Sequence, residues 1–388
     1  MSKIIHGDCL EKLKELSDCS VDCCVTSPPY YGLRDYGTGH WEGGNPDCPH
    51  RRLSKYLSKT ITGHAQEELK GNVGDAIYKT VCPLCGAIRV DRQIGLEETP
   101  QEYIDKLVQV FREVRRVLKD DGTLWLNIGD SYAAERGGSH QPAETLGGGE
   151  HGYTQDGSRT NRGRGDTYNP TRNAHAIGLK HKDMIGIPWM LAFALRQDGW
   201  YLRQDIIWHK PNPMPESVKD RCTKSHEYIF LLSKKERYYF DYQAIQEDSK
   251  WYEQDARADK GRIAYDGKRR QGGVINTKAQ ESFVLLNEKR NKRDVWSVST
   301  QAVKEAHFAT FPEKLIEPCI LAGSKPGGIV LDPFFGSGTT GRVATKLNRN
   351  YIGIELNPDY IDIGNRRTEN VQMCIQGFLR EKHEQRRY

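Results

Sequence analysis

The chain has 388 residues, 28% of them charged, and a formal net charge of +5, which allows one large or two ordinary domains and only mildly favours a polyanionic partner. Its first residues, MSKIIHGD, lack the layout of a secretory signal, and no apolar run reaches membrane-spanning length. The ten cysteines are irregularly placed, several inside apolar runs, so we expect a cytoplasmic protein with reduced thiols that contacts no membrane.

Short apolar strands alternate with amphipathic helices, which predicts an α/β fold with a mostly parallel sheet. The clearest helix, 99–119, has Thr99 at its cap, Pro100 in its first turn and apolar residues at helical spacing. Further helices are expected at 188–198, 311–323, 339–347 and 358–371. Strands are expected at 3–8, 21–27, 122–129, 201–210, 226–234, 328–332 and 350–356.

Three segments interrupt this alternation and are predicted to be insertions. Residues 33–95 are polar and hold cysteine–histidine pairs, 133–182 are rich in Gly, Asn, Arg and His, and 245–295 are strongly charged with both signs. The second of these reads as a long, flexible loop within the core. The catalytic core is then expected to comprise 1–32, 96–244 and 296–388.

The segment GGIVLDPFFGSGTTG, residues 327–341, predicts a cofactor-binding loop. Its glycines match the G-x-G-x-x-G pattern, and Glu355 lies about one βα unit further on, where an acid can bind ribose hydroxyls. The pattern alone also suits a structural turn or a nicotinamide cofactor. Asp332 and Phe334 favour S-adenosylmethionine, because a carboxylate attracts a sulfonium and would repel a pyrophosphate.

A second unusual stretch, TSPPYYG at 26–32, follows an apolar strand and joins a hydroxyl, two prolines and aromatic rings. Pro28 and Pro29 have no backbone N–H, so a rigid turn here can present the Pro28 carbonyl beside the Ser27 hydroxyl as two acceptors. A plain strand-ending turn is the alternative.

SPPY at 27–30 and DPFFGSGTT at 332–340 together resemble the motifs of S-adenosylmethionine-dependent DNA amino-methyltransferases. The catalytic motif comes first and the cofactor loop last, which is the permuted order of that family's β group. The resemblance covers nearly the whole core and breaks over the three insertions. It implies a Rossmann-like methyltransferase fold with helices on both faces of the sheet and a DNA-recognition insertion. The cysteine–histidine pairs of the first insertion add a predicted zinc-knuckle insertion.

The resemblance also implies a role for each matching residue. Ser27 and Pro28 would bind the exocyclic amine of a base that has left the duplex, with Pro29 stiffening the turn and Tyr30 stacking on the base. The cofactor would be held by Asp8, Thr310, Phe311, Lys314, Asp332, Phe334, Gly336, Gly338, Thr339 and Glu355. Asp8 could equally cap the following helix, and we expect His226 and Glu227 to be structural.

Cys48-Pro-His50 and Cys82-Pro-Leu-Cys85 lie within the first insertion and predict a structural zinc site. This insertion has few apolar residues, so a metal would supply what packing cannot. Either His40 or His64 could replace His50, and unligated surface thiols are the alternative.

Double-stranded DNA is the expected partner, read by the insertion 245–295, although a charge run also suits a solvated face. The candidate DNA contacts are Asn212, Trp251, Arg257, Lys268, Arg269 and Arg270. No nuclease motif is visible in the chain. It would therefore serve a separately encoded restriction endonuclease or act alone as an orphan or phage enzyme, in a bacterial or phage context.

Serine at the first motif position is typical of cytosine-N4 enzymes, and aspartate of adenine-N6 ones, so Ser27 favours cytosine N4 with adenine N6 as the alternative. Both target amines are conjugated to a ring, and the residues alone do not separate them. The competing functions are N-methylation of RNA or of a protein glutamine, whose enzymes usually carry Asn-Pro-Pro-Tyr, and DNA binding by a zinc module without catalysis.

Overall fold

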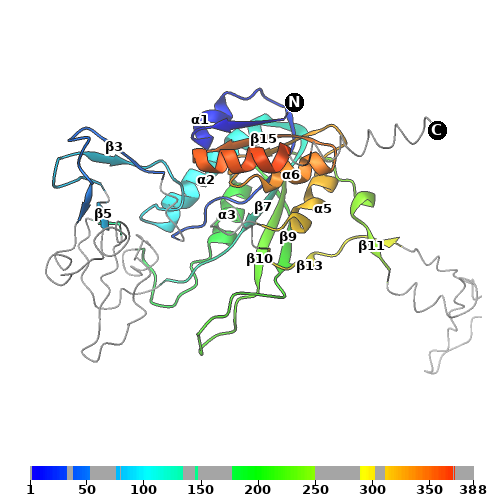
Figure 1. Cartoon of the computed structure of the whole chain (residues 1–388). Coiled ribbons are helices and arrows are strands. Elements are labelled where there is room, and N and C mark those ends of the chain that lie inside the picture. Colours follow the sequence, from blue (N-terminus) through cyan, green and yellow to red (C-terminus); the bar gives the residue numbers. More distant parts are fainter. Residues whose placement is uncertain are drawn as a thin grey trace, which may run out of the picture.

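An eight-stranded sheet forms the centre of the molecule (Figure 1). In this computed structural model, residues 2–32, 38–52, 76–78, 80–133, 145–146, 177–249, 289–301, 311–369 and 371 are described. The strands of the sheet, in spatial order, are β1 (Lys3–His6), β15 (Asn350–Glu355), β14 (Ile329–Asp332), β2 (Val21–Thr26), β7 (Leu118–Ile128), β10 (His226–Ser233), β9 (Tyr201–His209) and β13 (Val295–Ser297).

The sheet is mostly parallel, as the sequence predicts. β1, β15, β14, β2 and β7 all run in one direction, whereas β10 is antiparallel to both of its neighbours. β9 and β13 are parallel to each other. Because β10 alone is reversed, its first residues lie at the edge where all the other strands end.

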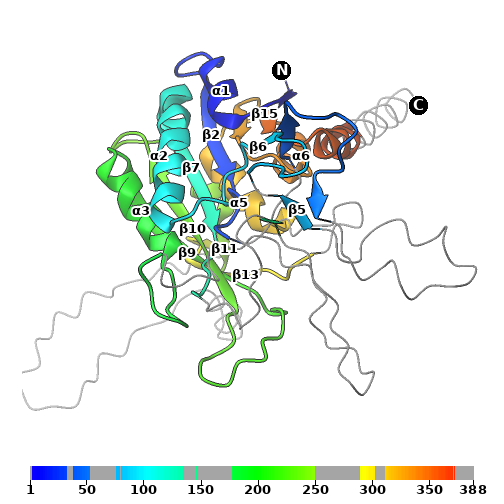
Figure 2. The same cartoon turned by 90° about the vertical axis from the view of Figure 1, so that its left-hand side faces the viewer.

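Helices cover both faces of the sheet (Figures 1 and 2). On one face, α1 (Cys9–Lys14), α2 (Pro100–Val117) and α3 (Ile187–Gln197) pack over Cys24. On the other face, α5 (Glu313–Gly323) and α6 (Thr339–Lys346) pack over Cys23 and Val25. Neighbouring side chains of a strand point to opposite faces, so the apolar run of β2 supplies both cores. A last helix, over 358–369, lies beside α6 (Figure 1).

The boundary between α2 and β7 differs from the sequence prediction. The Thr99 hydroxyl accepts a hydrogen bond from the Glu102 amide at 3.2 Å, as expected for the cap of α2. The helix ends at Val117, however, because β7 already begins at Leu118 and is longer than the strand predicted from its apolar stretch. Strand β13 was not predicted at all, since its three residues are too few to show a period.

The insertions form small sheets of their own. β3 (His40–Glu42) pairs with β6 (Ile88–Val90), and β11 (Glu247–Asp248) pairs with β12 (Lys289–Arg290). β4 (Arg51–Arg52) and β8 (Thr145–Leu146) pair on either side of β5 (Ala76–Tyr78). β3 and β5 lie to one side of the central sheet (Figure 1). The segments 33–95 and 133–182, separate in sequence, therefore share a sheet.

A short 3-10 turn, Gln243–Ile245, precedes β11. Within the part of the chain that the structure describes, every helix is too short or too polar to cross a membrane.

Candidate active site

The ends of the central strands surround a cavity of about 300 Å³. Parallel strands place their carboxyl ends at one edge, where α/β proteins bind ligands. The cavity brings the two predicted motifs together, although they lie some three hundred residues apart in the sequence. Of the predicted site residues, it is lined by Asp8, Ser27, Pro28, Pro29, Tyr30, Phe311, Asp332, Phe334, Gly336, Thr339 and Glu355.

Other predicted site residues lie elsewhere. Gly338 and Lys314 do not line the cavity: Gly338 is the cap of α6, and Lys314 lies in the first turn of α5. Asn212 lies in the loop after β9 and bonds the backbone of Thr300, accepting from its amide at 3.0 Å. Outside the described residues are Thr310, His64, Trp251, Arg257, Lys268, Arg269 and Arg270.

The SPPY turn (residues 27–30) is fixed from the helix side. The fully buried Tyr103 of α2 donates a hydrogen bond from its hydroxyl to the Pro29 carbonyl, at 2.8 Å. Gly32 donates its amide to the carbonyl of Gly95 at 2.8 Å, which ties the chain after the turn to the end of the first insertion. The turn is therefore rigid before any ligand arrives.

The glycine loop (residues 333–338) and the neighbouring strand β15 require glycine for two different reasons. Gly336 and Gly338 have φ of +51° and +81°, a region that favours glycine. Gly353 of β15 instead makes room for a ring, because a Cβ there would lie 2.3 Å from Phe335. The buried Arg367 of the last helix donates to the Ser337 carbonyl at 2.8 Å and holds the loop from behind.

Asp332 ends β14 and is only 2% exposed. Its carboxylate accepts hydrogen bonds from the hydroxyls of Thr26, at 2.6 Å, and Thr340, at 2.7 Å, and from the Phe334 amide at 3.1 Å. Burial raises the pKa of this carboxyl to about 6, and the three donors partly oppose that increase. Asp332 thus links β2, β14 and α6 at the floor of the cavity.

Glu355 ends β15 and faces the glycine loop. One carboxylate oxygen accepts from the Gly336 amide at 2.7 Å and the other from the Asn357 amide at 2.8 Å. Burial raises the pKa of Glu355, while these two amides lower it. The carboxylate is held in place and retains lone pairs toward the cavity.

Asp8 caps a helix and also lies on the wall of the cavity. Its Oδ1 accepts from the amides of Leu10 at 2.9 Å and Glu11 at 3.1 Å, which caps α1. The same residue lines the cavity, and within the described structure its Oδ2 accepts no hydrogen bond.

These residues fit S-adenosylmethionine. The ligand carries a sulfonium and an ammonium group against one carboxylate, and the cavity offers the carboxylates of Asp8, Asp332 and Glu355. Carboxylates also accept from ribose hydroxyls, and Phe334 and Phe311 offer rings for an adenine.

Among the polar residues of the cavity that the sequence did not assign to chemistry are Asn127, Lys210 and Glu227. The Tyr30 hydroxyl donates to Glu227 at 2.7 Å, and the Lys210 ammonium forms an ion pair with the same carboxylate. Each residue sits at a strand end of the same sheet edge. No motif marks them, and only the reversed direction of β10 brings Glu227 to this edge.

The sequence comparisons agree with this geometry. A family described as DNA methylase matches residues 21–366. The chain belongs to this family. It is 41% identical to the Type II methyltransferase M.Cfr9I of Citrobacter freundii, over 93% of this chain and 85% of that protein. It is also 41% identical to the Type II methyltransferase M.SmaI of Serratia marcescens, over 94% and 90%.

Among solved structures, the PvuII DNA methyltransferase (cytosine-N4-specific) matches with a TM-score of 0.50 and 16% identity, over 95% of this chain and 89% of that one. At this identity the likeness concerns the fold, a mixed α/β architecture around a large sheet.

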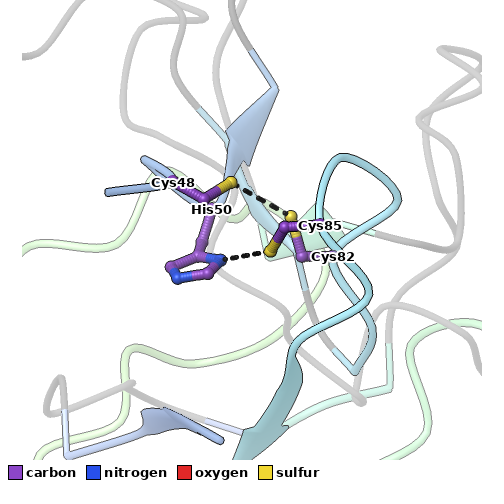
Figure 3. Close-up of side chains that lie close together, drawn as sticks. All are labelled: Cys48, His50, Cys82 and Cys85. Atoms are coloured by element: carbon purple, nitrogen blue, oxygen red, sulfur yellow. Dashed lines mark hydrogen bonds between the residues drawn. The ribbon is translucent and has the colours of Figure 1, made fainter. Parts of the chain in front are cut away.

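This DNA methylase carries a second cluster, in the first insertion, formed by Cys48, His50, Cys82 and Cys85 (Figure 3). Their ligand atoms all lie within 4.8 Å of one another. The Cys48 and Cys82 sulfurs are 3.7 Å apart, and Cys85 Sγ lies 3.5 Å from His50 Nδ1. The four residues predicted as metal ligands are thus brought together.

The surroundings of this Cys/His cluster suit a metal. Backbone amides, first that of Asn45, lower the pKa of Cys85. The His50 amide also lowers the pKa of Cys48, but burial and the neighbouring thiols raise it overall, so Cys85 is the thiol closer to the thiolate form that binds zinc. The Trp41 ring stacks on His50 at 4.5 Å between ring centroids. The alternative ligand His40 instead contacts Glu42 at 3.2 Å.

Proposed function

We propose that this DNA methylase transfers a methyl group from S-adenosylmethionine to N4 of a cytosine in double-stranded DNA. The observation that carries the proposal is the single cavity lined by the SPPY turn together with Asp8, Gly336 and Glu355. Membership of the family establishes DNA methylation as the class of activity. The geometry supports an acceptor amine beside Ser27 and a methyl donor beside the glycine loop.

The target amine is a poor nucleophile because its lone pair is delocalised into the ring. Ser27 Oγ and the Pro28 carbonyl are preorganised acceptors for the amine hydrogens and favour a tetrahedral nitrogen. S-adenosylmethionine supplies a methyl group bound to a cationic sulfur, which is a good leaving group. The base must leave the duplex, at a cost of a few kcal/mol that stacking on Tyr30 partly offsets.

Cytosine N4 is favoured over adenine N6 by the neutral serine at position 27. Tritiated S-adenosylmethionine and unmethylated plasmid DNA, followed by digestion to nucleosides and mass spectrometry, test the assignment. We expect N4-methylcytosine. N6-methyladenine alone would reassign the base, and no labelled nucleoside would contradict the activity.

The Cys/His cluster is proposed to bind one structural zinc ion. Three thiols and an imidazole form a complete tetrahedral set that leaves no position for catalysis. Methyl transfer needs no Lewis acid, so a role in folding the insertion is the one that the chemistry supports.

The remaining proposals concern the cellular context. The relatives are named Type II methyltransferases, which supports a restriction–modification role in the bacterial cytoplasm beside a separately encoded endonuclease. Residues 245–295 remain the predicted region for reading the DNA sequence, with the basic candidates acting on phosphates and guanine edges.

A further inference from the structure

Glu227 is a carboxylate of the cavity that cofactor binding does not use. Its side chain is 14% exposed and that of Lys210 is 18% exposed, so their ion pair is largely withdrawn from water. Glu227 Oε2 accepts from the Tyr30 hydroxyl at 2.7 Å, and Oε1 bonds Lys210. The Asn127 amide approaches Oε2 at 3.4 Å.

The ring of Tyr30 is packed in place, and its hydroxyl is the group that can exchange a proton. Gly129 leaves room for the ring, because a Cβ there would lie 2.7 Å from Tyr30 Cε2. Burial and then the charge of Glu227 raise the pKa of Tyr30 well above its usual range, while the Ser27 hydroxyl acts in the opposite direction. Ser27 and Tyr30 belong to the same turn and both line the cavity. The phenol therefore stays neutral, able to accept a proton on one side and donate one on the other.

We propose that Ser27, Tyr30 and Glu227 form a proton relay from the target amine to the Glu227 carboxylate. This inference rests on the proposed function. It assigns Glu227 a role in the reaction, whereas the sequence alone indicated a structural one. Lys210 holds the carboxylate in position on the side away from Tyr30.

The relay accounts for every atom of the transfer. The amine nitrogen forms a bond to the methyl carbon while the carbon–sulfur bond breaks and its electron pair stays on sulfur. The nitrogen, now cationic, gives a proton to Ser27 Oγ. Ser27 passes its own proton to the Tyr30 oxygen, Tyr30 passes its proton to Glu227 Oε2, and both hydroxyls end unchanged. Ser27 is itself too weak a base to keep the proton.

The alternative is that Glu227 only joins β9 to β10 through Lys210. Backbone pairing already does this, since Lys210 donates its amide to the Ser225 carbonyl at 2.7 Å and Trp208 lies opposite Glu227 in the register. A purely structural pair would also not require the hydroxyl of Tyr30, which points into the same carboxylate.

The test uses the full chain and three variants: Glu227→Gln, Tyr30→Phe and the double variant. Single-turnover transfer of tritiated methyl from S-adenosylmethionine to unmethylated plasmid DNA gives the rate of the chemical step. Calorimetry gives the Kd for S-adenosylmethionine, and thermal unfolding reports stability. Glu113→Gln is the matched control, because it neutralises another half-buried, ion-paired glutamate, on α2 and away from the cavity.

We expect each single variant to slow the single turnover about a hundredfold, with the Kd unchanged within about twofold. The double variant should lose no more than the slower single one, because the residues act as a unit. Rates near wild type, losses that multiply in the double variant, or a fall in cofactor affinity and unfolding temperature together would each overturn the relay. If wild-type protein transfers no methyl at all, the proposed function itself fails, which is a different result.

Discussion

The cavity at the sheet edge and the Cys/His cluster of the first insertion are stabilised in different ways. The cavity rests on two large hydrophobic clusters, one on each face of the sheet, which contain fully buried side chains such as Trp125 and Phe111. Among the described residues around the Cys/His cluster, Cys82 and Ala87 form the buried hydrophobic part, with Trp41 packed against them. The cavity is thus fixed by the fold, and we expect the first insertion to depend on the proposed zinc ion for its own fold.

Because of this difference, we expect substitutions in the cavity and substitutions in the Cys/His cluster to have different effects. Disturbing the cavity should change chemistry while the core stays folded, because the core does not depend on the groups that face the ligand. Disturbing the Cys/His cluster should unfold the insertion while the central sheet remains. The segments nevertheless meet, since Gly95 at the end of the insertion accepts a hydrogen bond from Gly32, just after the SPPY turn.

The largest effect is expected for Cys82→Ser. Structural zinc contributes on the order of 10–16 kcal/mol to the folding of small zinc domains, and this variant removes a fully buried ligand. Elemental analysis should find close to one zinc per wild-type chain and little in the variant. Limited proteolysis should cut the variant within 33–95 first. If metal-free wild-type protein resisted protease as well as the metal-bound protein, the insertion would not depend on zinc and the two regions would not differ in this way.

Ser27→Ala should leave the fold intact and slow turnover by about a hundred- to a thousandfold, since loss of one preorganised partner costs about 2.7–4 kcal/mol. The Kd for S-adenosylmethionine should stay near the wild-type value, because Ser27 belongs to the turn and not to the glycine loop. Single-turnover kinetics and calorimetry measure the two quantities. An unchanged rate would show that the hydroxyl takes no part in the reaction.

Asp332→Asn tests the charge beneath the cavity. The pKa of Asp332 is raised by burial from 3.8 to about 6, so the folded state binds the proton more tightly than the unfolded chain. The stability that this group contributes to the folded state is therefore lost as the pH rises from 3.8 to about 6. Relative to wild type, the variant should gain about 2–3 kcal/mol in free energy of unfolding between pH 4 and pH 7. Denaturant unfolding of both proteins at pH 4 and pH 7 measures this gain. The same change in free energy of unfolding with pH in variant and wild type would contradict it.

The smallest effect is expected for Trp41→Ala. Loss of the stacked ring on His50 should cost about 0.5–1.5 kcal/mol and appear as a modest fall in zinc affinity. A competition titration with a chelator measures the change. Methylation at saturating zinc should remain close to wild type, and a large loss there would indicate that the insertion shapes the cavity directly.

The sequence predicted the parts of the site whose constraints are local. The SPPY turn, the glycine loop and the Cys-Pro-Leu-Cys knuckle each show their chemistry within a few neighbouring residues. Glu227 and Lys210 carry no such mark, because an antiparallel strand inside a parallel sheet brings them to the cavity. The pairing of β5 with β8 could not be predicted from the sequence either, because each strand has only two or three residues and the two strands belong to different segments.

The pairing of β1 with β15 has a consequence for the synthesis of the protein. Ile4 lies beside Gly353 and His6 beside Glu355 in the register, so β1 cannot pair with β15 until that much later strand has been synthesised. Asp8 and Glu355, which face the same cavity, come together only after β15 has been synthesised. A product that terminates before β15 would lack Glu355 and could not form this wall of the cavity.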